Sequence, residues 1–206
     1  MSALSRDVLE AGDQAPNTTQ AAEGLPRRRF SVAEIEAFVR TGLIPEHERF
    51  ELIGGEIVPM SPKGMRHERI KTWLAKTLYR QLPDRFLTTS ETTLKLGSDT
   101  FLEPDFVLYE TTSGIGSLDP STCLLAIEIG ISSLAYDQGP KAAIYASFGV
   151  RELWVIDGTR LKTRVFREPG PDGYGWIADH APTEALEPLA VPGFSLTLYD
   201  YESFEG

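Results

Sequence analysis

The sequence predicts an α/β fold of the α+β kind, with a mixed central β-sheet flanked by helices and with a helix and a hairpin added on the N-terminal side. Apolar runs typical of strands alternate along the chain with segments of helical periodicity. The run 122–129 is apolar enough for its strand to be covered on both faces. Because the 206 residues are 41% hydrophobic and show no interdomain linker, we expect one domain with a sizeable core.

The N-terminal part divides into a tail and a short helix. Residues 1–27 show little apolar periodicity and cannot bury enough surface to offset the entropy of ordering, so we expect a disordered tail. The folded domain is predicted to span residues 28–206. Ser31 and Glu34 form a capping-box pattern, which predicts a helix that ends near Gly42.

A hairpin and a second helix are predicted next. The segment 49–60 carries two short apolar runs around Gly54 and Gly55, and both glycines tolerate the positive φ of a tight turn. Apolar residues then recur at helical spacing over residues 67–82, and Pro83 stops the pattern.

The remaining elements are predicted from strand composition and from helical spacing. Residues rich in β-branched and aromatic side chains predict strands over 85–96, 103–109, 122–129 and 152–157. A helix is predicted over 138–148. An outer hairpin is predicted from 161–167 and 174–178, around the turn sequence Gly-Pro-Asp-Gly.

Composition excludes several classes of protein. Cys123 is the single cysteine, so neither an intrachain disulfide nor a cysteine metal cluster can form, and its apolar neighbours predict a core position. No window approaches the roughly 18 to 20 apolar residues of a membrane span. The N-terminus lacks the pattern of a signal peptide, so we expect a cytoplasmic protein that makes no membrane contact.

The charge distribution bears on nucleic-acid binding. The formal net charge of −10 opposes binding to a polyanion. The segment 63–85, however, has seven basic residues against Glu68 and Asp84 and a local charge of +5. We therefore expect a DNA-binding helix face with a solvated face as the alternative. The basic residues on this helix are Arg66, Arg69, Lys71, Lys76 and Arg80.

Two acidic residues stand at the ends of apolar strands. Asp105 follows Pro104 at the start of one strand, and Glu128 ends the apolar run of another. A carboxylate at the edge of a core must pair with a cation, shift its pKa or bind a metal. Because hard carboxylate oxygens suit Mg²⁺ or Mn²⁺ better than Zn²⁺, we expect either ion, with the backbone carbonyl of Ile129 and water completing its shell.

Three further residues are candidates for the same site. Lys141 shares the inward face of its helix with Tyr145 and should reach Glu128 or a water beside it, unless its amine extends to solvent. Glu51 is either a further metal ligand or a solvated strand residue. His67 lies on the inner side of the basic helix, where it could orient phosphate or make only a local hydrogen bond. A divalent cation held by carboxylates beside a lysine suits phosphodiester hydrolysis by water.

These residues lie in segments that resemble the Uma-type restriction endonuclease family, a widespread bacterial branch of the PD-(D/E)XK nuclease superfamily. The similarity runs from about Phe30 to Tyr199. It is carried by Phe50-Glu-Leu-Ile-Gly-Gly-Glu-Ile, Ser61-Pro with His67, Glu103-Pro-Asp-Phe, Ile127-Glu-Ile, the segment Ser132 to Ala146, and Glu152-Leu-Trp-Val-Ile-Asp157.

The resemblance implies a restriction endonuclease-like core with a four-stranded mixed sheet. It implies that Asp105 and Glu128 are the metal-binding acids, and that Lys141 replaces a lysine that the superfamily carries on the strand, at the position of Gly130. Ile131 departs from relatives that carry a polar or acidic residue there.

We therefore expect a Mg²⁺-dependent endodeoxyribonuclease in which Asp105, Glu128, Lys141, Glu51 and His67 form the reaction centre. Two alternatives remain. A non-catalytic binding module that keeps the fold is favoured by the acidic charge and by Ile131. A metal-dependent hydrolase of a small phosphate ester is favoured by the acidic charge alone. Tyr174 and Trp176 on the outer hairpin could form a homodimer interface or cover the core.

Overall fold

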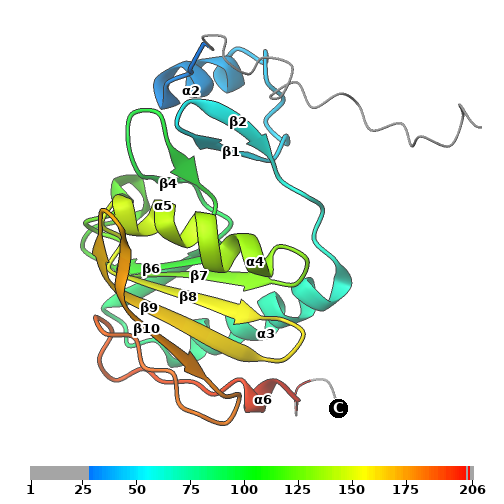
Figure 1. Ribbon diagram of the computed structural model, residues 1–206, viewed down its shortest axis with the longest axis vertical. Coiled ribbons are helices and arrows are strands. Elements are labelled where there is room, and N and C mark those ends of the chain that lie inside the picture. The colour runs from blue at the N-terminus through cyan, green and yellow to red at the C-terminus, as the bar shows by residue number, and fades with distance from the viewer. Residues whose placement is uncertain (1–27, 203, 205–206) are drawn as a thin grey trace, which may run out of the picture.

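A computed structural model of the chain describes residues 28–202 and residue 204. The tail that we expected at residues 1–27 lies outside the described residues. The described chain forms two β-sheets, a small four-stranded one and a larger six-stranded one, which Figure 1 shows one above the other. The segment between β2 and α3 connects the two sheets along one side.

The small sheet has the strand order β2-β1-β5-β4. Its strands are β1 (Phe50–Ile53), β2 (Glu56–Pro59), β4 (Leu94–Lys95) and β5 (Phe101–Leu102). The predicted hairpin is confirmed, because Gly54 and Gly55 turn the chain with φ of 56° and 80°. Helix α2 (Val32–Arg40) covers this sheet, and Ser31 and Glu34 form the predicted capping box at its start.

The large sheet has the order β10-β9-β8-β7-β6-β3, in which β7 and β8 are parallel and the other neighbours are antiparallel. Its strands are β3 (Phe86–Ser90), β6 (Phe106–Glu110), β7 (Leu125–Gly130), β8 (Glu152–Asp157), β9 (Lys162–Gly170) and β10 (Gly173–His180). The predicted mixed sheet is confirmed, and the outer hairpin β9–β10 extends it beyond the four strands that the resemblance implied.

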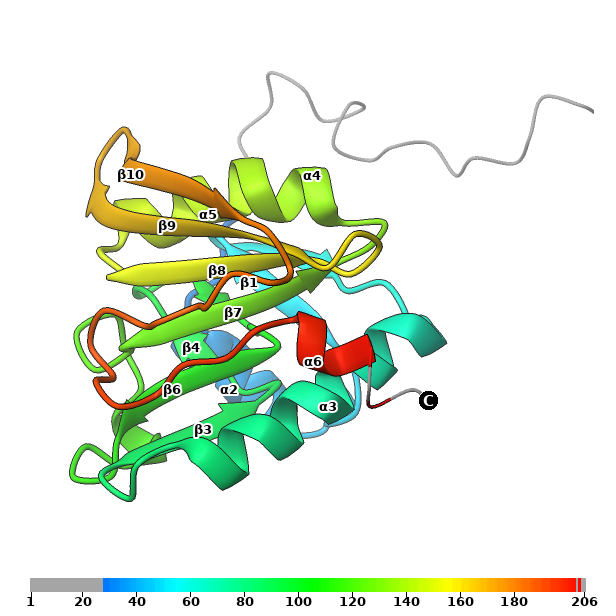
Figure 2. The ribbon, with the colours of Figure 1, turned by 90° about the horizontal axis from the view of Figure 1, so that it is seen from below.

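Helices lie on both faces of the large sheet. Figure 2 shows α3 (Met65–Gln81) and α6 (Tyr199–Glu202) on one side of the strands and α4 (Leu134–Tyr136) with α5 (Ala142–Ser147) on the other. Side chains alternate between the two faces along the central strands. On β7, Ile127 and Ile129 pack toward α3, whereas Ala126 packs toward α5. Glu128 therefore faces α5.

The strand that we predicted over residues 85–96 is wrong, because the structure divides this segment between the two sheets. Strand β3 ends at Ser90, and Glu91 follows with a positive φ of 49°, which redirects the chain. Leu94 and Lys95 then pair with β5 in the small sheet. Composition alone predicted one strand because both halves are rich in β-formers.

The helix before β8 begins earlier than the predicted residue 138. It starts at Leu134 and passes through a π-helical segment, Asp137–Lys141, before α5. Pro140 lies inside this segment and has no N–H to donate, which accounts for the local departure from α-helical bonding. Asp137 and Lys141, four residues apart, share one face of this segment, and both are buried.

Cys123 is fully buried, as its apolar neighbours predicted. Burial raises the pKa of its thiol to about 12, so the reactive thiolate is absent at neutral pH. We expect no reaction with a disulfide thiol reagent in native buffer and one equivalent of reaction in urea, measured by absorbance. Rapid labelling of the native protein would show that this end of β7 is not covered.

No helix within residues 28–202 has the length and apolar content to cross a membrane.

Candidate active site

Lys141 joins two buried carboxylates from different sheets. Its Nζ lies 2.8 Å from Oε1 of Glu51 on β1 and 2.8 Å from Oε1 of Glu128 on β7. The hydroxyl of Tyr145, one helical turn after Lys141, donates to the same oxygen of Glu128 at 2.7 Å. The backbone N–H of Glu103 donates to Glu51. The predicted contact between Lys141 and Glu128 is thus present, and Glu51 is buried beside it.

Asp105 lies at the centre of a second set of contacts. Its Oδ2 accepts a hydrogen bond from the backbone N–H of Ile129 at 2.7 Å and lies 3.1 Å from Nε2 of His67. Its Oδ1 lies 3.1 Å from Nζ of Lys63, which precedes α3. His67 is buried on the inner side of α3, as its spacing predicted. Asp105 is thus bound to the strand that carries Glu128.

Strand register brings the two sets together. Phe106 on β6 is paired with Ile127 on antiparallel β7, and continuing this register by one residue places Asp105 opposite Glu128. Pro104 is buried directly before Asp105 and has no N–H to continue the ladder, so the strand begins after it. Asp105 and Glu128 therefore stand at the same end of the sheet.

Burial and like charge raise the pKa of Glu128. Removal of its carboxyl from water is the main cause; Lys141 opposes the rise and the nearby carboxylates of Asp105, Asp137 and Glu51 add to it, and the pKa rises to about 8. Although burial opposes the charge of Lys141, the carboxylates of Glu128 and Glu51 raise its pKa above the ordinary lysine value. The lysine therefore stays protonated, and the carboxyl of Glu128 also tends to keep its proton at neutral pH.

Asp105 shows the opposite shift. Although burial opposes ionisation, the hydrogen bond from His67 and the charge of Lys63 lower the pKa of Asp105 to about 2. Burial raises the pKa of Asp137, whose Oδ2 accepts a hydrogen bond from Ser133 at 2.6 Å. The site thus combines Asp105, which is firmly ionised, with Glu128 and Asp137, which hold their protons more tightly than ordinary carboxyl groups.

These shifts predict a pH-dependent stability. The folded-state pKa of Glu128, about 8, exceeds its ordinary value of 4.5, so its stabilising protonation is complete below pH 4.5 and is lost as the pH rises to 8. Asp105 acts in the opposite sense, between its ordinary 3.8 and about 2. We expect Glu128→Gln to flatten the decline in free energy of unfolding between pH 5 and pH 8, measured in urea. An unchanged slope would contradict the shift at Glu128.

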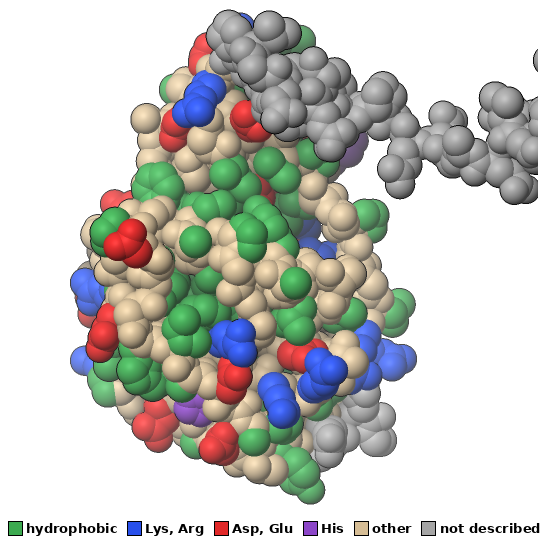
Figure 3. Space-filling view, in the orientation of Figure 1, with side chains coloured by type: hydrophobic (Ala, Val, Ile, Leu, Met, Phe, Trp, Pro, Cys, Tyr) green, Lys and Arg blue, Asp and Glu red, His purple; other side chains and the backbone are tan. Residues whose placement is uncertain are grey.

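A pocket of about 710 Å³ opens beside these residues. Figure 3 shows a hollow between the β2–α3 connection and the body of the molecule, with Lys or Arg atoms visible inside it. Asp105 does not line the pocket, but Lys63 and His67, which contact its carboxylate, do. The residues that line this pocket are Glu51, Val58, Pro59, Met60, Ser61, Pro62, Lys63, Gly64, His67, Glu128, Ile129, Ile131, Ser132, Ser133, Tyr136, Asp137 and Lys141.

Gly130 shows why the strand carries no lysine at this position. A Cβ built on Gly130 would lie 2.8 Å from the Cα of Leu134 and 2.9 Å from Oδ2 of Asp137, so no side chain fits without moving the following helix. Lys141 reaches Glu128 from that helix instead. Ile131 follows Gly130 and lies partly exposed at the pocket.

The basic helix is α3, and contacts within the chain engage several of its charges. Arg66 donates to the carbonyls of Gly158 and Thr159. Lys71 pairs with Glu68 at 2.7 Å and with Glu91 at 3.0 Å. Lys76 lies over the ring of Phe204, whereas Arg69 and Arg80 are exposed. Figure 3 shows Lys and Arg side chains gathered at the lower right, where Figure 1 places part of α3.

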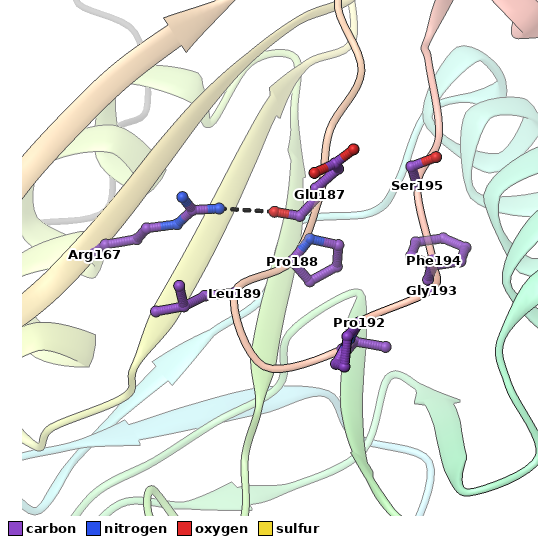
Figure 4. Close-up of a pocket in the computed structure, with 9 residues that line it drawn as sticks. Arg167, Glu187, Pro188, Leu189, Pro192, Gly193, Phe194 and Ser195 are labelled. Atoms are coloured by element: carbon purple, nitrogen blue, oxygen red, sulfur yellow. Dashed lines mark hydrogen bonds between the residues drawn. The ribbon is translucent and has the colours of Figure 1, made fainter.

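A second pocket, of about 590 Å³, lies under the segment 187–195 (Figure 4). Arg167 enters it and donates to the carbonyl of Glu187 at 2.7 Å, while its guanidinium also pairs with buried Glu152. Arg167 and Glu187 carry the charge among the described residues that line this pocket, and the other lining residues are mostly apolar. The pocket beside Glu128 is therefore the better candidate for chemistry.

A metal ion requires donors that converge. Within residues 28–202, no three Asp, Glu, His or Cys side chains stand close enough together to hold one as the side chains lie. Instead, Lys63 pairs with Asp105, and Lys141 pairs with Glu51 and Glu128. The donor chemistry nevertheless fits a divalent cation, because Glu51, Asp105, Glu128 and Asp137 interact electrostatically while these two lysines compensate only two of the four carboxyls.

The family model for Uma2, described as "Putative restriction endonuclease", matches residues 35–199. The chain belongs to the Uma2 family. A similar solved structure is that of a protein from Anabaena variabilis ATCC 29413, described as "a putative nuclease belonging to DUF820". It has a TM-score of 0.62 at 16% sequence identity and covers 80% of this chain and 96% of its own. At this identity the likeness shows the nuclease-like fold alone. No curated protein matches the chain.

Family membership confirms the resemblance that the sequence indicated, and the fold agrees with it. The structure adds residues to the site that we did not predict as site members, namely Lys63, Tyr136 and Asp137. Lys63 was counted only as part of the basic segment, although it stands four residues before His67. Asp137 stands four residues before Lys141, a spacing that places both on one helix face, but the helix was predicted to begin only at residue 138. Tyr145 was predicted to face inward, without its bond to Glu128.

Proposed function

We propose that this chain is a metal-dependent endonuclease that hydrolyses DNA phosphodiester bonds. The observation that carries the proposal is the excess of four clustered carboxyls over two lysines at one end of the sheet, beside a pocket. A divalent cation would balance this excess. Membership of a family described as restriction endonucleases supports the same substrate class.

Asp105 and Glu128, with Glu51 and the backbone carbonyl of Ile129, are the residues that would hold Mg²⁺ or Mn²⁺. When bound, the cation would polarise the phosphate and acidify a water molecule. Ionised Asp105 offers a carboxylate at neutral pH, because its pKa is about 2. Glu128 has to release its proton on metal binding, so the affinity for metal should rise with pH toward 8.

Lys141 and His67 would act on the water and the phosphate. Lys141 is fixed between Glu51 and Glu128 and lines the pocket, where its ammonium can position a water molecule or stabilise charge that develops on the phosphate. His67 also lines the pocket and is held by Asp105. Lys63 pairs with Asp105, so its ammonium becomes available to a phosphate oxygen when that carboxylate takes a cation.

A small phosphate ester is the second candidate substrate. The engagement of Arg66 and Lys71 within the chain favours it, because fewer charges on α3 remain to bind a long polyanion. A non-catalytic binding module that keeps the fold is the third candidate, and the acidic net charge of −10 and Ile131 at the pocket favour it.

Supercoiled plasmid DNA tests the proposal. We expect nicked and then linear DNA in Mg²⁺ or Mn²⁺, and intact DNA in EDTA. A small phosphodiester with a coloured leaving group, assayed in parallel, identifies the second candidate if it alone is hydrolysed. Binding of DNA without cleavage of either substrate would identify a non-catalytic module and contradict the proposal.

A further inference from the structure

The pocket beside Glu128 is lined by two apolar groups of residues, here called its walls, and by a charged group, here called its floor. One wall carries Ile131 and the ring of Tyr136, and the other carries Val58, Met60 and the prolines of the β2–α3 connection. The floor is formed by the carboxyl groups of Glu51, Glu128 and Asp137 and by the amine of Lys141. Such a shape suits a flat ring with apolar faces joined to an anionic group.

We propose that this pocket takes one unpaired nucleotide, so that the substrate is DNA that is single-stranded or locally unpaired. The base would lie between Tyr136 and the wall of the β2–α3 connection, with its phosphate toward the floor. This inference rests on the proposed function in so far as the floor is the reaction centre.

Tyr136 is placed to stack on a base. Its side chain is 38% exposed and lines the pocket. Tyr136 lines the same pocket as Glu51, Glu128 and Lys141, so its ring stands beside the charged residues of the floor. A base that stacks on this ring brings its own phosphate close to Lys63 and Lys141, which also line the pocket.

The size of the pocket favours one nucleotide over a duplex. A volume of about 710 Å³ lies within the range of roughly 300–1,000 Å³ that is usual for small-molecule pockets. A paired duplex keeps its bases stacked inside and presents phosphates and groove edges to the protein. Enzymes whose pockets take a base therefore act on single strands or extrude the nucleotide. The apolar walls here would have no partner on an intact duplex.

The contacts of the basic residues on α3 also favour an unpaired nucleotide over a duplex. Binding to duplex DNA usually depends on many free Lys and Arg side chains that displace counterions. Here Arg66 binds backbone carbonyls and Lys71 is held by two carboxylates. Stacking against Tyr136 and Ile131 would supply affinity that does not depend on these charges.

The test is a binding assay with a 2-aminopurine base in the middle of a short oligonucleotide. The oligonucleotide is titrated with the full chain as a single strand and as a paired duplex, in Ca²⁺, and a gel checks that it stays intact. We expect the emission of the single strand to fall on binding, because the base stacks, and its Kd to be about ten-fold lower than that of the duplex.

Variants of Tyr136 make the test specific. We expect Tyr136→Ala to weaken binding of the single strand about ten-fold and to remove the emission change, while Tyr136→Phe, which keeps the ring, binds like wild type. Tyr199→Ala removes an exposed tyrosine of α6 as the matched control and should change nothing. Ile131→Ala is a second pocket variant, should Tyr136→Ala fail the check of thermal unfolding.

The outcomes separate this inference from the proposed function. Equal affinity for duplex and single strand without an emission change, or wild-type binding by Tyr136→Ala, would overturn the inference even if plasmid cleavage is observed. Binding of the single strand that depends on Tyr136, without cleavage of any DNA in Mg²⁺ or Mn²⁺, would support the inference and contradict the endonuclease.

Discussion

Replacing Asp105 by Asn is expected to reduce Mg²⁺-dependent DNA cleavage by about a thousand-fold or more, because a charged metal ligand is worth several kcal/mol in the transition state. Asn keeps the shape of the side chain and an oxygen that can still accept the N–H of Ile129. The variant loses the charge that pairs with Lys63. Initial rates of plasmid cleavage give the effect, and thermal unfolding shows whether the fold is retained.

Asp157→Asn is the matched control for this variant. Asp157 is a buried aspartate at the end of β8, and its register partner on β7 is Gly130. Its carboxylate accepts the N–H groups of Thr159 and Arg160 in the following turn, which is a structural role. We expect this control to cleave DNA at the wild-type rate. Cleavage by Asp105→Asn at a rate close to that of the control would remove Asp105 from the reaction centre.

Replacing Lys141 by Met is expected to have the largest effect on stability. It leaves Glu51 and Glu128 buried without their cation, and breaking a buried ion pair in this way costs about 3–5 kcal/mol. Because Glu128 can take up a proton in the folded protein, the loss should be smaller at pH 5 than at pH 8. Urea unfolding followed by circular dichroism at both pH values measures it.

A second substitution separates lost charge pairing from lost packing. In the Lys141→Met background, Glu128→Gln removes one unpaired carboxylate and should restore part of the lost free energy of unfolding at pH 8. A double variant that is less stable than Lys141→Met by the full cost of Glu128→Gln alone would show that the two side chains act independently. That result would contradict the ion pair.

The central part of the fold was predictable because its signals are local. The apolar run before Glu128 identified a buried strand, and Pro104 marked the start of the strand that follows Asp105. Helical spacing placed Lys141 on the inward face. The resemblance joined these three signals into one site, and the structure confirms that Lys141 contacts Glu128.

The remaining parts depend on contacts between distant residues. Glu91 turns the chain out of the large sheet, and nothing in its neighbours distinguishes it from a strand residue. The pair between Lys63 and Asp105 spans 42 residues and depends on where the β2–α3 connection crosses the sheet end. Asp137 was missed because the helix begins at Leu134, four residues before the predicted start, and so includes Asp137 on the face of Lys141.

The most direct test of a metal centre at Asp105 and Glu128 is the anomalous scattering of crystals soaked in Mn²⁺. We predict a peak within coordination distance of both carboxylates, with Lys63 moved away from Asp105 to admit the ion. Crystals soaked at saturating Mn²⁺ that show no peak there, and in which Lys63 still binds Asp105, would contradict the proposed reaction centre.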